Sequence, residues 1–211
     1  MNELSETKER IFDVFVEMAS ALGYENVTTR DIAKKIGINA ASIYYHFASK
    51  DKILEFAYEY YTKYQYDNRV PVSAMKKMMD ASSAQELVTT LFFTFMTDDQ
   101  KKYRRMILIT KIIYMRLFQD PLANEIYAQS NINNAEYVTE ILNYGIESGR
   151  LEKDFDVQTF ADVLIGAMAI MGINAFAGAD YKIGQLDQEK RILALLARLL
   201  GSAMVAAPRP V

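Results

Sequence analysis

The residues best suited to bind another molecule lie between Asn39 and His46. A face that meets only water would carry more Glu and Lys. A face that enters a crowded groove needs small side chains near the bases and hydroxyl donors near the phosphates. The residue types therefore favour contact with double-stranded DNA over a surface hairpin with chance tyrosines, because the outward side chains include no carboxylate: Ala40, Ala41, Ser42, Tyr44, Tyr45 and His46.

A short helix with strong start and stop signals precedes this segment. Thr28 is a natural N-cap, and Asp31 follows at the spacing of a capping box. Val27 and Ile32 occupy the two positions of a hydrophobic staple, which sets the angle at which the chain enters the helix. Gly37 supplies the left-handed residue that ends it.

A second short helix is expected at 40–46, capped by Asn39, and a third begins after Ser49. Two helices joined by a short turn that contains glycine form a helix-turn-helix, whose second helix can enter the major groove of DNA. The first helix of the chain, expected from Ser5 to Leu22, completes a three-helix core. The acidic residues near its start are interpreted as a solvated face.

This block resembles the DNA-binding domain of the tetracycline-repressor (TetR/AcrR) family of bacterial regulators. The resemblance covers about the first quarter of the chain. The family often has a polar pair such as Lys-Gly where this sequence has Ala40-Ala41, so base reading is expected to rest more on apolar contacts and DNA shape. The matching stretches are Thr28-Thr29-Arg30-Asp31-Ile32-Ala33, Gly37-Ile38, Ile43-Tyr44-Tyr45-His46-Phe47 and Ser49-Lys50-Asp51.

The resemblance and the expected geometry imply a set of DNA contacts. Tyr44 and Lys50 match family positions that grip phosphate on either side of the groove. Thr28 or Thr29, at a helix N-terminus, donates to phosphate together with backbone N–H groups. His46 either contacts phosphate or caps the last carbonyls of its helix. The residues expected at the base edges are Ala40, Ala41 and Ser42, with Asn39 and Tyr45 beside them.

The charge distribution fits a local DNA reader. The net charge of the 211 residues is −3. Residues 27–54 nevertheless carry five basic against two acidic side chains, while residues 1–26 carry two basic against six acidic ones. This pattern disfavours a non-specific nucleic-acid coat and permits a specific reader whose positive charge is concentrated in one segment.

The composition indicates an all-α protein, because prolines and glycines are few and apolar residues recur at the helical spacing of 3.6 residues over long stretches. The chain has no cysteine and no apolar leader at its polar N-terminus, which we interpret as compatible with the cytoplasm. Its one histidine is His46, and the motifs of nucleophilic, phosphate-loop or dinucleotide enzymes are missing. We therefore expect no catalytic residue, no cofactor, no metal and no enzyme activity.

The expected organisation is a helix-turn-helix domain over 1–49, a connecting helix over 50–66, a helical ligand-binding and dimerisation domain over 67–202 and a flexible tail over 203–211. Asn131, Asn133 and Asn134 suggest a kink or break in one long helix. The helices expected after the joint at 67–71 span about 71–80, 83–96, 99–118, 121–148, 156–177 and 187–200.

The two C-terminal helices, about 156–177 and 187–200, are candidates for a dimer interface. The apolar run 163–173 is too short for a bilayer, which needs about 20 residues, so no membrane partner is expected. Small side chains along it allow another helix to approach closely. The pair resembles the family's four-helix dimer interface, and two-fold symmetry would present two recognition helices to a palindrome.

Aromatic and Met side chains of the C-terminal domain favour a core over a pocket by themselves, and the family resemblance raises the pocket interpretation. Thr110 and Asn174 are polar within apolar runs and could make internal hydrogen bonds or ligand contacts. The candidate pocket residues are Phe92, Met96, Tyr103, Thr110, Tyr114, Phe118, Tyr137, Met171 and Asn174.

The sequence thus predicts a homodimeric transcriptional regulator, a repressor that binds a palindromic operator and is released by a small hydrophobic or amphipathic effector. The alternative is a helical small-molecule-binding or scaffold protein that has lost specific DNA reading.

Overall fold

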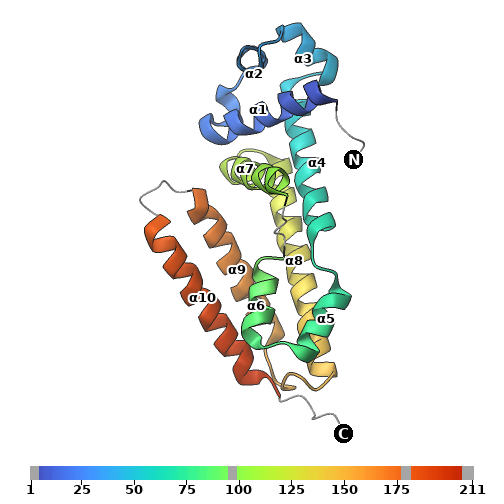
Figure 1. Ribbon diagram of the computed structural model, residues 1–211, viewed down its shortest axis with the longest axis vertical. Coiled ribbons are helices and arrows are strands. Elements are labelled where there is room, and N and C mark those ends of the chain that lie inside the picture. Colours follow the sequence, from blue (N-terminus) through green and yellow to red (C-terminus); the bar gives the residue numbers. More distant parts are fainter. Residues whose placement is uncertain (1–4, 95–98, 177–181, 206–211) are drawn as a thin grey trace. The chain divides into compact units, whose positions relative to one another are not determined.

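The computed structural model describes residues 5–94, 99–176 and 182–205, with the backbone alone for 174–176 and 182–186. Every regular element within these residues is a helix, as the sequence predicts (Figure 1). The elements are α1 (Glu6–Leu22), the short 3-10 helix η1 (Tyr24–Asn26), α2 (Thr29–Ile36), α3 (Ala40–His46), α4 (Lys50–Asn68), α5 (Val72–Ala81), α6 (Ala84–Phe92), α7 (Gln100–Arg116), α8 (Pro121–Glu147), α9 (Val157–Phe176) and α10 (Lys182–Ala203).

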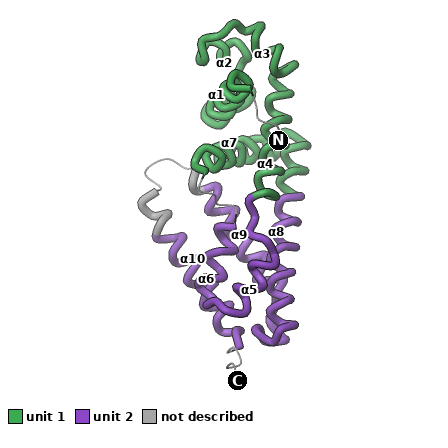
Figure 2. The backbone as a smooth tube through the Cα atoms, turned by 45° about the vertical axis from the view of Figure 1, so that its right-hand side comes forward, with its two compact units in different colours: residues 1–67, 97–128 green, residues 68–96, 129–211 purple. Residues whose placement is uncertain are grey.

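The chain forms two compact units (Figure 2). Unit 1 comprises residues 1–67 and 97–128, and unit 2 comprises residues 68–96 and 129–211. Helices α4 and α7 therefore belong to the same compact unit as the helix-turn-helix. The functional division at 49/50 and 66/67 expected from the sequence stays a prediction.

Local capping explains where the first helices begin and end. Ser5 caps α1, and Gly23 ends it with a φ of 86°. The side chains of Ile11, Phe12 and Phe15 are fully buried on one face of α1, as are Ile32 of α2 and Ile43 of α3. Their burial makes the predicted three-helix core, because the two short helices alone would remove too little apolar surface from water.

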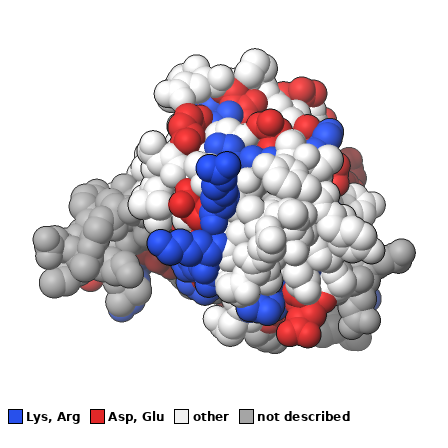
Figure 3. Space-filling view, turned by 90° about the horizontal axis from the view of Figure 1, so that it is seen from above, with Lys and Arg blue, Asp and Glu red and all other residues white. Residues whose placement is uncertain are grey.

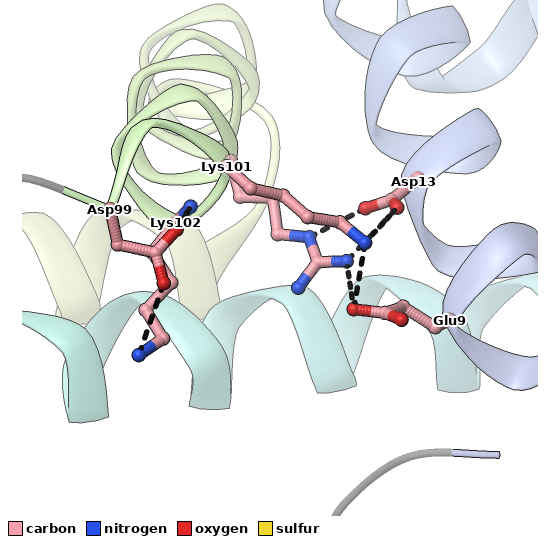
Figure 4. Close-up of polar contacts among 6 residues, drawn as sticks. Glu9, Asp13, Asp99, Lys101 and Lys102 are labelled. Atoms are coloured by element: carbon pink, nitrogen blue, oxygen red, sulfur yellow. Dashed lines mark hydrogen bonds and ion pairs between the residues drawn. The ribbon is translucent and has the colours of Figure 1, made fainter. Parts of the chain in front are cut away.

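Glu9 and Asp13 of α1 are paired, which corrects the expectation of a solvated face for these two residues, whereas Glu6 is exposed. Glu9 and Asp13 lie one turn apart and face the first turns of α7 (Figure 4). Arg105 of α7 binds both carboxylates, and Lys101 lies 3.0 Å from Glu9. This pairing depends on how α7 crosses α1, because the partners are more than 90 positions apart in the sequence.

Unit 2 has its own apolar core. Helix α10 packs against α6 and α9, and α5 packs against α6. Fully buried residues come from each of these helices and from the second half of α8, including Met75, Leu87, Ile141, Leu164 and Leu200. This core is separate from the three-helix core of unit 1.

Three expectations about unit 2 need correction. Helix α8 is continuous through Asn133 and Asn134, where Arg69 donates to the carbonyl of the first and the side chain of the second. Helix α10 begins at Lys182 rather than at 187. The expected tail is fixed as far as Val205, whose backbone N–H donates to the Arg150 carbonyl at 2.9 Å, while residues 206–211 lie outside the described residues.

Candidate nucleic-acid interface

The turn between α2 and α3 is built from backbone constraints. Thr28 and Asp31 form the predicted capping box: the Asp31 N–H donates to Thr28 Oγ1 at 3.2 Å, and the Thr28 N–H donates to Asp31 Oδ2 at 3.1 Å. Hydrogen bonds from the Thr28 side chain and backbone lower the pKa of Asp31. Gly37 ends α2 in the left-handed region, with φ 75° and ψ 35°. A side chain there would strain the turn.

Helix α3 is anchored by very few residues. The Asn39 side chain accepts from the Ala41 N–H at 2.9 Å and caps the helix as predicted. Ile43 is fully buried, and Phe47, just after the helix, is 5 % exposed. Because the anchors occupy one narrow face, the other faces of this seven-residue helix stay available for contact.

The available face is the uncharged one predicted from the sequence. Tyr45 is 88 % exposed and Tyr44 is 55 % exposed, and Ala41 is exposed between them and the N-terminus of the helix. The hydroxyl oxygens of Tyr44 and Thr29 lie 3.1 Å apart. This contact joins the middle of α3 to the start of α2, so two of the expected phosphate donors lie together.

Exposed basic side chains belong to α2, the helix that packs against α3. Arg30 and Lys34 of α2 are exposed and make no ion pair within the described residues. Lys35 pairs with Glu17 at 3.5 Å, and both side chains keep substantial exposure. Figure 3 shows a strip of Lys and Arg beside a broad area without charged side chains. A strip of basic side chains can bind the phosphates of DNA, and an uncharged area can enter a groove of the duplex.

Lys50 and His46 make contacts that the sequence did not reveal. The Lys50 ammonium donates to the Tyr24 carbonyl at 2.9 Å and lies 3.9 Å from the centre of the Tyr24 ring. The His46 ring meets the Tyr45 ring edge-on, 5.1 Å between centres. Within the described residues the imidazole makes no hydrogen bond to the last carbonyls of α3.

The candidate pocket residues are distributed over both units. Tyr103, Thr110, Tyr114 and Phe118 belong to unit 1, whereas Phe92, Tyr137 and Met171 belong to unit 2. Met96 and the side chain of Asn174 lie outside the described residues.

Two of these residues are engaged internally, and one is on the surface. Thr110 Oγ1 donates to the Met106 carbonyl at 2.8 Å, which gives this polar group a partner within its own helix. The Tyr137 hydroxyl donates to the Val70 carbonyl at 2.7 Å. Phe118 is 93 % exposed, so its side chain is not enclosed by its own unit. The pocket set as a whole remains a prediction.

Comparisons with known proteins identify the fold and the family. Residues 11–56 match the family described as "Bacterial regulatory proteins, tetR family". The chain is 32 % identical over 143 residues to the biofilm operon icaADBC HTH-type negative transcriptional regulator IcaR of Staphylococcus aureus, covering 67 % of this chain and 70 % of the relative. The chain belongs to the tetR family. It is a DNA-binding transcriptional regulator with the helix-turn-helix described above.

Solved structures of other transcriptional regulators share the fold across nearly the whole chain. A putative transcriptional regulator from Saccharomonospora viridis in complex with choline superposes with a TM-score of 0.66 at 20 % identity, covering 96 % of this chain and all of the other. The ketosteroid transcriptional regulator KstR2 of Mycobacterium tuberculosis gives a TM-score of 0.60 at 20 % identity, covering 97 % and 98 %. Within the described residues, no helix has the length and apolar character needed to cross a membrane.

Sequence reasoning missed three residues that support the interface. The Tyr24 ring contacts the Lys50 ammonium, and the Arg116 guanidinium lies against the same ring. Arg105 of α7 forms an ion pair with Asp13 of α1. The basic start of α7 and the four-residue spacing of acids on α1 were visible as patterns. The partner of each was not, because these contacts join segments far apart in the sequence.

Proposed function

We propose that this tetR-family regulator is a homodimeric repressor that reads a palindromic operator with two copies of α3. The carboxylate-free exposed face of α3, bordered by hydroxyl and basic side chains, is the observation that carries the proposal. Ala40, Ala41 and Ser42 meet base edges, and Asn39 and Tyr45 lie beside them. Phosphate is held by Thr28 or Thr29, Tyr44 and Lys50, with His46 a further candidate.

Sequencing the DNA that the protein retains from its own genome tests this proposal. A two-fold symmetric motif is expected, with half-sites about 34–36 Å apart. Recovery of sequences without a shared palindrome would contradict dimeric reading.

Replacing Ser42 by Ala tests the base contacts. We expect selection from random DNA to return an altered motif, because Ser42 faces the bases, while affinity for unrelated duplexes stays nearly unchanged. Lys50→Ala is the matched comparison, since loss of a phosphate contact weakens binding to all sequences alike. An identical motif from wild type and Ser42→Ala would remove Ser42 from the base readers.

Dimerisation through α9 and α10 is supported by apolar side chains that unit 2 leaves exposed. One face of α9 packs on the core through Ala161, Leu164 and Met171. Another face exposes large aliphatic residues at helical spacing, and α10 does the same. The exposed fractions are 49 % for Val163, 53 % for Ile170, 51 % for Ile173, 48 % for Leu195 and 47 % for Leu199. A Cβ built on Gly166, between two of these residues, meets nothing within 4 Å.

The variant Ile170→Glu tests this interface. A buried, unpaired carboxylate at each of two symmetric positions should convert the dimer to monomers at micromolar concentration. Ile132→Glu is the control, because Ile132 of α8 is 51 % exposed in the same unit but lies on neither helix. Sedimentation velocity should show a monomer for the first variant and a dimer for the second. Dimers for both would place the interface elsewhere.

Release by a small hydrophobic or amphipathic effector completes the proposal. Binding of a small molecule is supported by the family and by the choline named for one structural relative. We propose α4 as the lever, because this helix runs without interruption from the helix-turn-helix to the start of unit 2. Coupling of about 1–3 kcal/mol between the two sites would suffice to switch binding. Hydrogen exchange with choline as the first probe should change in α4; unchanged exchange in α4 alongside loss of DNA binding would exclude the lever.

A further inference from the structure

Tyr24 is held from three directions within unit 1. Its side chain is 9 % exposed, and its hydroxyl donates to a carboxylate oxygen of Asp51 in the first turn of α4. Its carbonyl accepts from the Lys50 ammonium at 2.9 Å, and that ammonium also lies 3.9 Å from the ring centre. The guanidinium of Arg116, at the end of α7, lies 4.2 Å from the same ring centre. One ring therefore contacts cations from two different helices.

The contact restricts the Lys50 side chain without using all of its hydrogen-bonding capacity. A lysine ammonium has three donors, and the Tyr24 carbonyl takes one of them. The flexible stem of a free lysine loses rotamer freedom when it binds phosphate. A lysine already held against an aromatic ring has lost most of that freedom before DNA arrives, and the Tyr24 carbonyl leaves two of its donors for phosphate.

Arg116 is itself fixed, so it can position the ring. Its Nη1 donates to Glu25 Oε1 in the same 3-10 helix as Tyr24, and its Nε donates to Asp120 Oδ2 at 3.1 Å. The Tyr58 hydroxyl donates to the same Asp120 oxygen at 3.0 Å. Burial raises the pKa of Asp120, but the hydrogen bonds from Arg116 and Tyr58 outweigh it and lower the pKa overall. Asp120 therefore stays charged and keeps Arg116 in place at neutral pH.

We propose that Tyr24 is a positioning residue for operator binding, which holds Lys50 ready for phosphate and is itself set by Arg116 of α7. This inference rests on the phosphate role proposed for Lys50. Tyr24 also lies four residues before Thr28, the N-cap of α2. A displacement of the last turn of α7 would reach Lys50 through the Arg116–Tyr24–Lys50 stack.

The first test measures affinity for a random-sequence duplex at several salt concentrations. Lys50→Ala should lower the slope of log affinity against log salt by about one. Tyr24→Leu should weaken binding about five-fold, the order expected for a partly desolvated cation–ring contact, and should lower the slope toward that of Lys50→Ala. Tyr24→Phe keeps the ring and should retain the wild-type slope. In the Lys50→Ala background, Tyr24→Leu should have no further effect on affinity.

The second test examines Arg116 and does not depend on whether Tyr24→Leu folds. Arg116→Met should weaken binding about two- to three-fold, and this loss should vanish in the Lys50→Ala background. Arg104→Met is the matched control, because it removes the same charge from the same helix and also breaks an ion pair to α1, with Glu17 at 2.9 Å, but does not touch Tyr24. It should bind like the wild type.

The outcomes separate the two proposals. An unchanged salt slope for Lys50→Ala would end the phosphate role of Lys50 and this inference with it. A lowered slope for Lys50→Ala, with wild-type affinity for Tyr24→Leu and Arg116→Met, would overturn the positioning role alone. Additive losses in the double variants would also overturn it, because Tyr24 and Arg116 would then act independently of Lys50.

Discussion

Replacing Arg105 by Met removes the buried charge that fastens α7 to α1. Arg105 is 8 % exposed. It donates two hydrogen bonds to Asp13, from Nε to Oδ1 at 2.5 Å and from Nη2 to Oδ2 at 2.9 Å. Nη2 also donates to Glu9 Oε1 at 2.7 Å. Methionine keeps part of the apolar stem near the Phe12 ring, so the variant mainly reports the loss of the guanidinium.

The size of the loss follows from the burial of each partner. Removing one partner of a buried ion pair lowers the free energy of unfolding by about 3–5 kcal/mol when the remaining charge has no access to water. Here the side chains of Asp13 and Glu9 are 30 % and 33 % exposed, and Lys101 lies 3.0 Å from Glu9, so water and this lysine compensate in part. We expect the free energy of unfolding to fall by about 2–3 kcal/mol, between the values for buried and surface pairs.

Urea unfolding at neutral pH, followed by circular dichroism and by tyrosine fluorescence, measures the change, since the chain has no tryptophan. Arg104→Met is the control: Arg104 is 68 % exposed and pairs with Glu17, so its loss should change stability by no more than about 0.5 kcal/mol. Equal losses for the two variants, or a loss below about 1 kcal/mol for Arg105→Met, would refute the idea that burial makes this pair strong.

Two further predictions follow from individual contacts. Hydrogen bonds from Arg105 and Lys101 lower the pKa of Glu9 from its ordinary value of 4.5, so Glu9 stabilises the fold above pH 4.5 and this contribution is lost as pH falls through the lowered pKa of the folded state. Urea midpoints measured against pH should fall less steeply in acid for Glu9→Gln; parallel curves would exclude the contribution. Gly145→Ala should destabilise unit 2 by about 1–3 kcal/mol, because the added Cβ would lie 2.8 Å from Leu151 Cδ1 and 3.0 Å from Met79 Cε. A thermal midpoint at or above the wild-type value would show that these side chains move aside at little cost.

Much of the helix-turn-helix could be predicted because its determinants are local. Thr28, Asp31, Gly37 and Asn39 act on residues within a few positions, and the structure confirms each as a cap or helix end. The start of α6 was predictable for the same reason, because Ser83 accepts a hydrogen bond from the Glu86 N–H only three residues away. Helix ends without such residues, as at the start of α10, were less accurately predicted.

The surroundings of two candidate pocket residues depend on contacts that the sequence alone does not show. Thr110 was singled out as a polar group in an apolar run, and its partner turned out to be a carbonyl one turn back in the same helix. Phe118 follows the helical apolar pattern of α7, yet that helix ends at Arg116 and leaves the ring exposed. Periodicity indicates which residues are apolar, but it does not show where a helix stops or what covers its face.

The sequence by itself determined the helix-turn-helix and the composition of its exposed face, because caps, staples and helical periodicity act over a few residues. Only the tertiary structure decided what holds that face in position. Arg105 and Asp13 are 92 positions apart, and Tyr24 and Asp51 are 27 apart. Pairs of this kind depend on how helices cross, and many other acidic and basic residues of the chain were equally plausible partners until the helices were packed.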